Sequence, residues 1–216
     1  MTISDNIRKL RATLPDGVRL VCVSKYHTES EILEAYATGE RVFGESRAQE
    51  LQVKAEHLPK DIQWHFIGHL QRNKAKQVCR YASMIQSVDS WRLLQTINQS
   101  TDKLIDILLE VHVATESTKS GLTPDELRCL LQDNDVSQLK NIRVRGLMGM
   151  ASLTTDTTQI RDEFHALRLL FEEIQNTYFP KDESFDTLSM GMSNDYNIAL
   201  SEHTTMVRIG SLLFGE

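Results

Sequence analysis

The sequence has few cysteines, and they are widely separated. Only Cys22, Cys79 and Cys129 occur among 216 residues, and no two of them form a C-x-x-C pair. An odd number of distant thiols excludes a disulfide framework of the kind found in small secreted domains. Free cysteine packs as a small hydrophobe. We therefore expect free, mostly buried thiols in a cytoplasmic protein.

Long apolar runs and an excess of positive charge are also lacking. No run approaches the roughly 20 apolar residues that span a bilayer. Residues 1–17 predict an amphipathic helix, without the pattern of a secretory signal. The net charge is −6 and the two signs are mixed along the chain, so no basic stripe marks a nucleic-acid surface. We expect no membrane or nucleic-acid partner, although a local anion site remains compatible with this balance.

The chain further lacks a glycine-rich turn after its first predicted strand. Lys25, Tyr26 and His27 occupy the place where a dinucleotide-binding sheet carries its glycines. No linker or change of composition divides the chain. We therefore predict a single domain over residues 1–216, with an N-terminal helix, and disfavour an open doubly wound sheet.

Eight short apolar segments alternate with longer helical segments. The predicted strands are 19–25, 40–46, 62–68, 82–89, 106–113, 144–150, 186–191 and 205–211. Each is rich in Val, Ile, Leu, Phe or Met, as expected for strands covered on both faces. This alternation predicts an α/β fold of the (β/α)8 TIM-barrel type.

The helical segments carry clear start signals. Thr28 and Glu31 have the spacing of a capping box, and so do Thr123 and Glu126, with Pro124 at the first helical position. The predicted helices are 28–39, 47–58, 71–81, 90–100, 123–133, 154–178 and 193–203.

In such barrels the chemistry lies at the carboxyl ends of the strands and in the loops that follow. Lys25 ends the first predicted strand and Arg208 lies near the end of the last. Closure of a barrel makes these two strands neighbours. We therefore expect Lys25 and Arg208 to face the same mouth.

The loops after the last two strands are typical of a phosphate site. They read "LSMGMSND" (188–195) and "RIGS" (208–211), and small residues let backbone N–H groups approach an anion. Gly191 and Gly210 are equally compatible with simple turns.

A lysine beside a phosphate site suits pyridoxal 5′-phosphate (PLP), since an amine condenses with the aldehyde while the phosphate is anchored separately. Partial burial and a nearby cation would favour the neutral amine that Lys25 needs. The alternative is a strand-end lysine that reaches to water.

Several motifs taken together resemble the YggS/PROSC family of PLP-homeostasis proteins over nearly the whole chain. They are "VSKYH" (23–27), "FGESRAQE" (43–50), "WHFIGHLQRNK" (64–74), "ESTKSGL" (116–122), "RGLMGM" (145–150), "LSMGMSNDY" (188–196) and "VRIGSLLFG" (207–215). The resemblance implies a fold-type III barrel, similar to the N-terminal barrel of alanine racemase, that holds PLP as an aldimine of Lys25.

The resemblance also implies individual roles. Ser189, Gly210 and Ser211 would bind the phosphate with Met190 close by, and Arg208 would face the pyridine nitrogen. This sequence departs from the family at two positions. Ser46 replaces the Asn of "FGEN". Because serine has a shorter side chain, this position either loses a direct contact with the cofactor or contacts it through a water molecule. Thr28 replaces a common Pro, and this change is harmless because Thr caps a helix.

Arg208 has a chemical meaning of its own. A guanidinium donates hydrogen bonds and does not accept them, so a ring nitrogen facing it stays unprotonated and withdraws electrons poorly. We therefore predict a PLP carrier or buffer that is not an enzyme and that delivers the cofactor transiently to apo-enzymes as a monomer. The alternatives are a PLP-dependent amino-acid racemase and a barrel for another phosphorylated metabolite.

Three further side chains have weaker signals. Lys119 is either a second amine for transfer of the cofactor or a solvated loop lysine. His65 and His69 lack the neighbouring ligands of a metal site, and we expect His65 to be hydrogen-bonded inside the barrel.

Overall fold

The computed structural model describes residues 2–114 and 120–215, which form a closed barrel of parallel strands in the order β1-β2-β3-β4-β5-β6-β7-β8. The predicted barrel is thereby confirmed. The strands are β1 (Arg19–Val23), β2 (Val42–Glu45), β3 (Gln63–Phe66), β4 (Ala82–Val88), β5 (Ile105–Val111), β6 (Ile142–Gly149), β7 (Thr187–Ser189) and β8 (Met206–Ile209).

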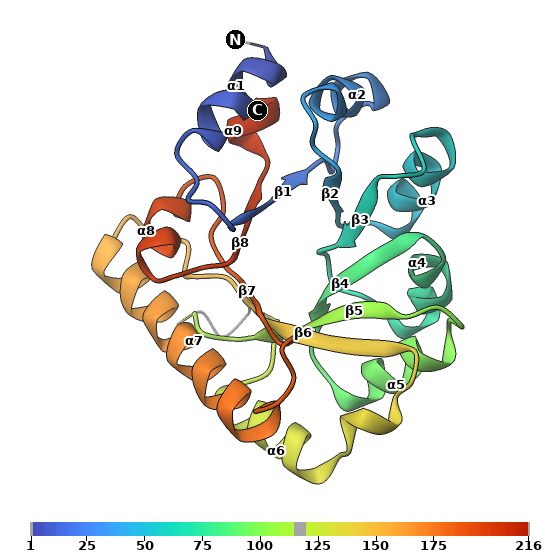
Figure 1. The fold of residues 1–216 in the computed structure, drawn as a ribbon, viewed down its shortest axis with the longest axis vertical. Helices are drawn as coiled ribbons and strands as arrows, with labels where there is room; N and C mark the ends of the chain where they lie inside the picture. Colours follow the sequence, from blue (N-terminus) through green and yellow to red (C-terminus); the bar gives the residue numbers. More distant parts are fainter. Residues whose placement is uncertain (1, 115–119, 216) are drawn as a thin grey trace.

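Helices surround the barrel, as Figure 1 shows. They are α1 (Ile3–Arg11), α2 (Glu29–Ala37), α3 (Ala48–His57), α4 (Ala75–Tyr81), α5 (Trp91–Gln99), α6 (Pro124–Asp133), α7 (Thr157–Tyr178), α8 (Tyr196–Ser201) and α9 (Ser211–Phe214), with the 3-10 turns η1 (Arg72–Lys74) and η2 (Val136–Gln138). The capping boxes at Thr28 and Thr123 are both present. The helix predicted over 193–203 is shorter, because a turn occupies 193–195.

Side chains of each strand alternate between two apolar regions. The outward side chains, such as Cys22 and Phe43, belong to the large core between strands and helices. A second, smaller cluster fills the barrel interior. It consists of Val21, Met84, Leu108, Met148 and Met206. This alternation determines which residues point into the mouth.

The two ends of the described chain lie together. Helices α1 and α9 pack side by side at the top of Figure 1, where blue meets red. The side-chain amide of Asn6 donates to the carbonyl of Leu213 at 2.9 Å. This contact fixes the short helix that follows β8, and with it one wall of the mouth.

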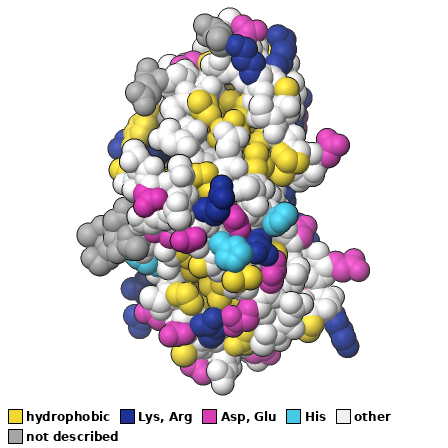
Figure 2. Space-filling model, turned by 90° about the vertical axis from the view of Figure 1, so that its left-hand side faces the viewer, with side chains coloured by type: hydrophobic (Ala, Val, Ile, Leu, Met, Phe, Trp, Pro, Cys, Tyr) yellow, Lys and Arg dark blue, Asp and Glu magenta, His cyan; other side chains and the backbone are white. Residues whose placement is uncertain are grey.

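Cys22 and Cys79 are buried and Cys129 is exposed, and all three thiols are free. Burial raises the pKa of Cys79 to about 11. Among the residues that the structure describes, no helix is long and apolar enough to cross a membrane. Figure 2 shows acidic, basic and hydrophobic side chains interspersed on one face of the molecule.

Candidate functional site

The predicted site residues converge on one half of the barrel. They follow or end β1, β2, β7 and β8, and these four strands are consecutive neighbours in the closed sheet. Val21 of β1 pairs with Arg208 of β8, and Val23 pairs with Gly44 of β2. Because all strands are parallel, their carboxyl ends open at the same mouth.

Lys25 lies in a turn beyond β1 and is exposed. The expectation that Lys25 ends the strand is wrong, because β1 already ends at Val23. Tyr26 has a φ of 69°, which turns the backbone, and its ring centroid lies 5.9 Å from Lys25 Nζ. The guanidinium of Arg47 approaches the same ring at 4.9 Å.

Arg208 lies inside the barrel and is only 4% exposed. Its Nη1 donates to the carbonyl and the Oγ of Ser189 at 2.9 and 2.6 Å, and its Nη2 donates to the carbonyl of Gly149 at 3.0 Å. Burial lowers the pKa of Arg208 to about 10. The guanidinium therefore still carries its proton at neutral pH and acts as a fixed donor.

A chain of buried polar side chains extends from Arg208 across the barrel. Ser189 Oγ donates to Gln86 Oε1 at 2.8 Å, and Gln86 Nε2 donates to His65 Nδ1 at 2.9 Å. Burial lowers the pKa of His65 to about 3, and the charge of Arg19 adds to this effect. The expectation of a hydrogen-bonded His65 inside the barrel is confirmed. The hydroxyl of Ser189 supports Arg208, a contact that the sequence did not indicate.

Met190 contributes little free hydrogen-bonding capacity. It is fully buried, and its N–H donates to the carbonyl of Met206 at 3.1 Å. The next residue, Gly191, has a φ of +95°, and a Cβ there would lie 2.7 Å from Ala199 Cβ. Gly191 is therefore required by the turn itself.

Gly210 is different, because neither strain nor crowding requires glycine at this position. Its φ is −119°, and a Cβ would meet Val23 only at an ordinary contact distance of 3.4 Å. Absence of a side chain instead leaves the backbone of this turn accessible. The N–H groups of Gly210 and Leu212 each donate to Ser193 Oγ at 3.4 Å.

Ser211 completes this turn at the start of α9. It is exposed, and neither its N–H nor its hydroxyl has a hydrogen-bond partner within the described residues. The 210–212 backbone and the hydroxyl of Ser193 thus form a group of donors next to β1. Sequence reasoning missed Ser193, although it follows the glycine turn directly.

Ser46 follows β2 and is half-buried. Gly44 faces the interior, where its Cβ position lies 3.0 Å from a methyl group of Val21. Alternation from Gly44 therefore directs Ser46 toward the mouth. The neighbouring Glu45 points outward and is fully buried.

Other polar groups complete the rim. Glu110 of β5 is 2% exposed, and burial raises its pKa. Its Oε1 accepts a hydrogen bond from Ser120 at 3.1 Å. His69 is exposed, with Nδ1 4.0 Å from Asp89. Lys119 lies outside the described residues. No group of three or more metal-binding side chains gathers anywhere in 2–114 or 120–215.

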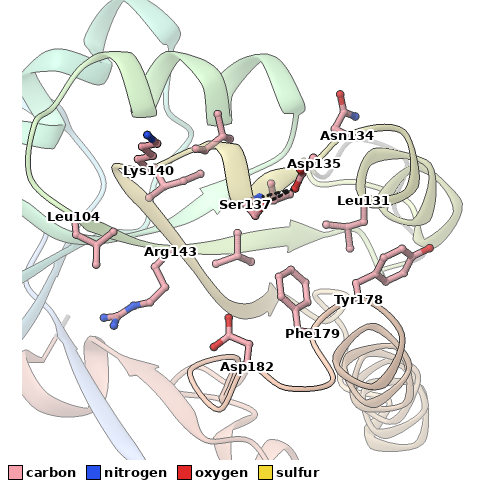
Figure 3. Close-up of a pocket in the computed structure, with 14 residues that line it drawn as sticks. Leu104, Leu131, Asn134, Asp135, Ser137, Lys140, Arg143, Tyr178, Phe179 and Asp182 are labelled. Carbon is pink, nitrogen blue, oxygen red and sulfur yellow. Dashed lines mark hydrogen bonds between the residues drawn. The ribbon is translucent and has the colours of Figure 1, made fainter.

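A cavity of about 520 Å³ lies at the opposite end of the barrel (Figure 3). Its lining includes Leu104 before β5, Ile142 at the start of β6, and Tyr178 and Phe179 at the end of α7. None of the predicted site residues lines it. Since the chemistry of this fold lies at the carboxyl ends of the strands, the mouth is the candidate site.

Comparisons with known proteins agree with this architecture. The family model described as "Alanine racemase, N-terminal domain" matches residues 1–216. The solved alanine racemase of E. faecalis superposes with a TM-score of 0.75 at 17% identity, and 57% of that chain is covered. At this identity the likeness concerns the fold alone.

More similar proteins carry a more specific name. Curated relatives called "Pyridoxal phosphate homeostasis protein" include one from Vibrio alginolyticus, 37% identical over 209 residues, covering 93% of this chain and 87% of the relative. Another, from Aquifex aeolicus, is 39% identical over 202 residues, covering 92% and 86%. The structure of PipY from Synechococcus elongatus with PLP bound has a TM-score of 0.89 at 35% identity, covering 99% and 100%.

The chain therefore belongs to the pyridoxal phosphate homeostasis proteins, a family built on the alanine racemase N-terminal barrel.

Proposed function

We propose that this protein binds PLP reversibly through Lys25 and serves as a carrier and buffer of the cofactor in the cytoplasm. The observation that carries the proposal is the convergence of an accessible amine, a donor-rich turn and a buried guanidinium at the ends of four adjacent strands. The relatives' names and the PLP-bound PipY structure support it.

The residues present fit this cofactor at three points. Lys25 provides the amine, and bound PLP supplies an aldehyde that links to amines reversibly. The hydroxyl of Ser193 and the N–H groups of Gly210 and Ser211 would hold the phosphate, with Ser211 Oγ as a further donor. Ser46 would face the ring from β2. In this assignment Ser189 acts through Arg208, and Met190 shapes the loop.

Arg208 is the reason why we propose that the protein binds PLP without catalysing a reaction on it. Its guanidinium is fixed by Ser189 and Gly149 and remains a donor at neutral pH. A ring nitrogen that accepts from this group keeps its lone pair and is not protonated. Carbanion chemistry, which a racemase needs, is thereby disfavoured. We propose a monomer that gives PLP to apo-enzymes in transient contacts.

The test is chemical labelling of the PLP-loaded protein with sodium borohydride, followed by peptide mass spectrometry. We expect one phosphopyridoxyl group, on Lys25. Lys25→Ala should remove the label and change the free energy of unfolding by less than about 0.5 kcal/mol, because the side chain is exposed. Lys60→Ala is the matched control and should keep the label. A label on Lys119 with Lys25 unmodified would refute the assignment.

A further inference from the structure

Both peptide groups that flank Lys25 are held by side chains of α3. The carbonyl of Ser24, which precedes Lys25, accepts a hydrogen bond from Lys54 Nζ at 2.8 Å. The N–H of Tyr26, which follows Lys25, donates to Glu50 Oε2 at 3.1 Å. Lys54 and Glu50 are four residues apart in α3, and Lys54 Nζ lies 3.5 Å from Glu50 Oε2. One helix face thus contacts the backbone on either side of the proposed amine.

The lysine of this pair is itself anchored in the layer between barrel and helices. Lys54 is 7% exposed, and its Nζ lies 2.8 Å from Glu45 Oε1, which also accepts from Ser24 Oγ at 2.6 Å. Burial raises the pKa of Glu45, although the hydrogen bonds from Lys54 and Ser24 act against this effect. A buried lysine in such an arrangement has its geometry determined by its partners.

The turn would not adopt its conformation unaided. Tyr26 has a φ of 69°, which is unfavourable for a bulky residue. The bond from its N–H to Glu50 stabilises this state. On the far side, the ring of His27 stacks on Phe214 of α9 at 4.4 Å.

We propose that Lys54 and Glu50 are positioning residues that form a clamp on the Lys25 backbone and direct its amine into the mouth. The inference rests on the proposed attachment of PLP to Lys25. In this proposal the side chains of Glu45, Lys54 and Glu50 act only through the backbone beside Lys25 and do not contact the cofactor. Their role is to keep the amine in the geometry in which the link to PLP reforms faster than the cofactor escapes.

The first experiment uses the protein without PLP and measures hydrogen exchange of the Tyr26 amide. Glu50→Ala removes the acceptor of this N–H, whereas Glu50→Gln retains an oxygen that can accept it. We expect exchange to be about tenfold faster in Glu50→Ala and changed by less than about twofold in Glu50→Gln. If exchange of the Tyr26 amide is accelerated equally in both variants, or in neither, the proposed clamp is wrong.

The second experiment measures release of PLP from the loaded protein, after trapping with an excess of an apo-enzyme. Lys54→Met leaves a buried carboxylate unpaired, so the double variant Glu45→Gln with Lys54→Met is made beside it. We expect release about tenfold faster in the double variant and in Glu50→Ala. Lys60→Met is the control, because Lys60 Nζ also donates to two carbonyls, those of Ala55 and Glu56, but beyond the other end of α3.

The aldimine absorbance distinguishes positioning from general loosening of the fold. We expect its pH midpoint to move in Glu50→Ala and in the double variant, and to return toward the wild-type value in Glu50→Gln. Unchanged release and an unchanged midpoint in folded variants would overturn the proposal. Absence of a label on Lys25 in the wild type would refute the proposed function alone, since amide exchange tests the clamp without PLP.

Discussion

Ser189 and Ser193 lie four residues apart in one loop region but contact different parts of the site. Ser189 is fully buried and touches Arg208 and Gln86, whereas Ser193 is half-buried and touches the backbone of the 210–212 turn. If the 210–212 turn holds the phosphate as proposed, loss of the Ser193 hydroxyl should affect only phosphorylated ligands, whereas loss of the Ser189 hydroxyl should affect every ligand that contacts Arg208. The two serines therefore allow the orientation of PLP to be tested.

We expect Ser193→Ala to weaken binding of PLP about tenfold while leaving binding of unphosphorylated pyridoxal nearly unchanged, because a donor to an anion is lost. Ser189→Ala should weaken both ligands by a similar factor, since it releases Arg208. Replacing Ser211 by Ala should resemble Ser193→Ala. Affinities from absorbance titration of both ligands provide the measurement. Equal weakening of both ligands by Ser193→Ala would show that the phosphate binds elsewhere.

His65 permits a prediction about pH. Its pKa falls from 6.5 to about 3 in the folded protein, mainly through burial. Below pH 6.5 the unfolded chain binds a proton that the folded chain refuses, so stability is lost as pH falls toward 3. The slope is about 1.4 kcal/mol per pH unit. We expect urea unfolding of His65→Gln to lack this contribution, so that the wild type loses stability relative to the variant only below pH 6.5. A pH-independent difference would contradict the buried neutral histidine.

At the scale of elements, α2 connects the Lys25 turn to β2 and begins with a capping box. Thr28 Oγ1 accepts from the N–H of Glu31 at 3.3 Å, and Glu31 Oε2 accepts from the N–H of Thr28 at 2.7 Å. These bonds lower the pKa of Glu31. The expectation that Thr28 serves as a cap in place of the family's proline is confirmed.

We expect Thr28→Ala to lower the free energy of unfolding by about 1 kcal/mol, because the N–H of Glu31 in the first turn of the helix loses its acceptor. Thr123→Ala is the matched variant, since α6 starts with the same capping box. Both should cost a similar amount in denaturant unfolding, and Thr28→Ser should restore most of it. Full stability of Thr28→Ala would mean that the Glu31 side chain alone caps α2.

Elements defined by local patterns were predictable from the sequence. The two capping boxes depend on residues three apart, and the core stripe of α7 depends on helical spacing. Ile160, Phe164, Leu167 and Ile174 recur at helical spacing in the predicted helix 154–178, and all four are buried in α7. The alternation of eight strands with helices was sufficient for the barrel, because few folds accommodate that order.

Contacts that depend on register between distant segments were not predictable. Lys54 resembles any helical lysine in the sequence, and only the folded chain brings it to Ser24, 30 residues away. The roles of Ser189 and Ser193 follow from the pairing of β7 with β8, where Ser189 lies opposite Met206. The end of β1 at Val23 likewise depends on its neighbours, so Lys25 was expected in the strand.

At the scale of the whole molecule, the question is whether a racemase barrel implies racemase chemistry. This chain covers 57% of the E. faecalis alanine racemase but 100% of PipY. Racemisation needs one group to remove a proton from one face of the substrate and another to deliver a proton to the opposite face. Lys25 could serve one face, and a tyrosine hydroxyl is a side chain that could serve the other.

The five tyrosines are placed poorly for that task. Tyr36 donates to Asp61, and Tyr81 to Glu56, on the outer surface. Tyr178 lines the cavity at the opposite end, and Tyr196 packs against the main core from α8. Tyr26 alone lies beside Lys25, and it belongs to the same turn. The ring of Tyr26 therefore lies next to the Lys25 amine and not across the mouth from it.

We therefore expect the PLP-loaded protein to release no more than a trace of the opposite enantiomer when it is incubated with single-enantiomer alanine or serine in deuterated water. Two independent features lead to this expectation: no tyrosine is placed opposite Lys25 in the part of the chain that the structure describes, and in the proposed site Arg208 would hold the ring nitrogen unprotonated. Chiral chromatography with mass detection is the measurement, and Lys25→Ala is the control for chemistry by free PLP. Arg208→Glu, which would let that nitrogen bind a proton, should increase exchange at Cα without giving efficient racemisation, since the second proton donor is still missing. Appearance of the opposite enantiomer over many turnovers, with deuterium at Cα and dependent on Lys25, would instead establish an enzyme and overturn the carrier proposal.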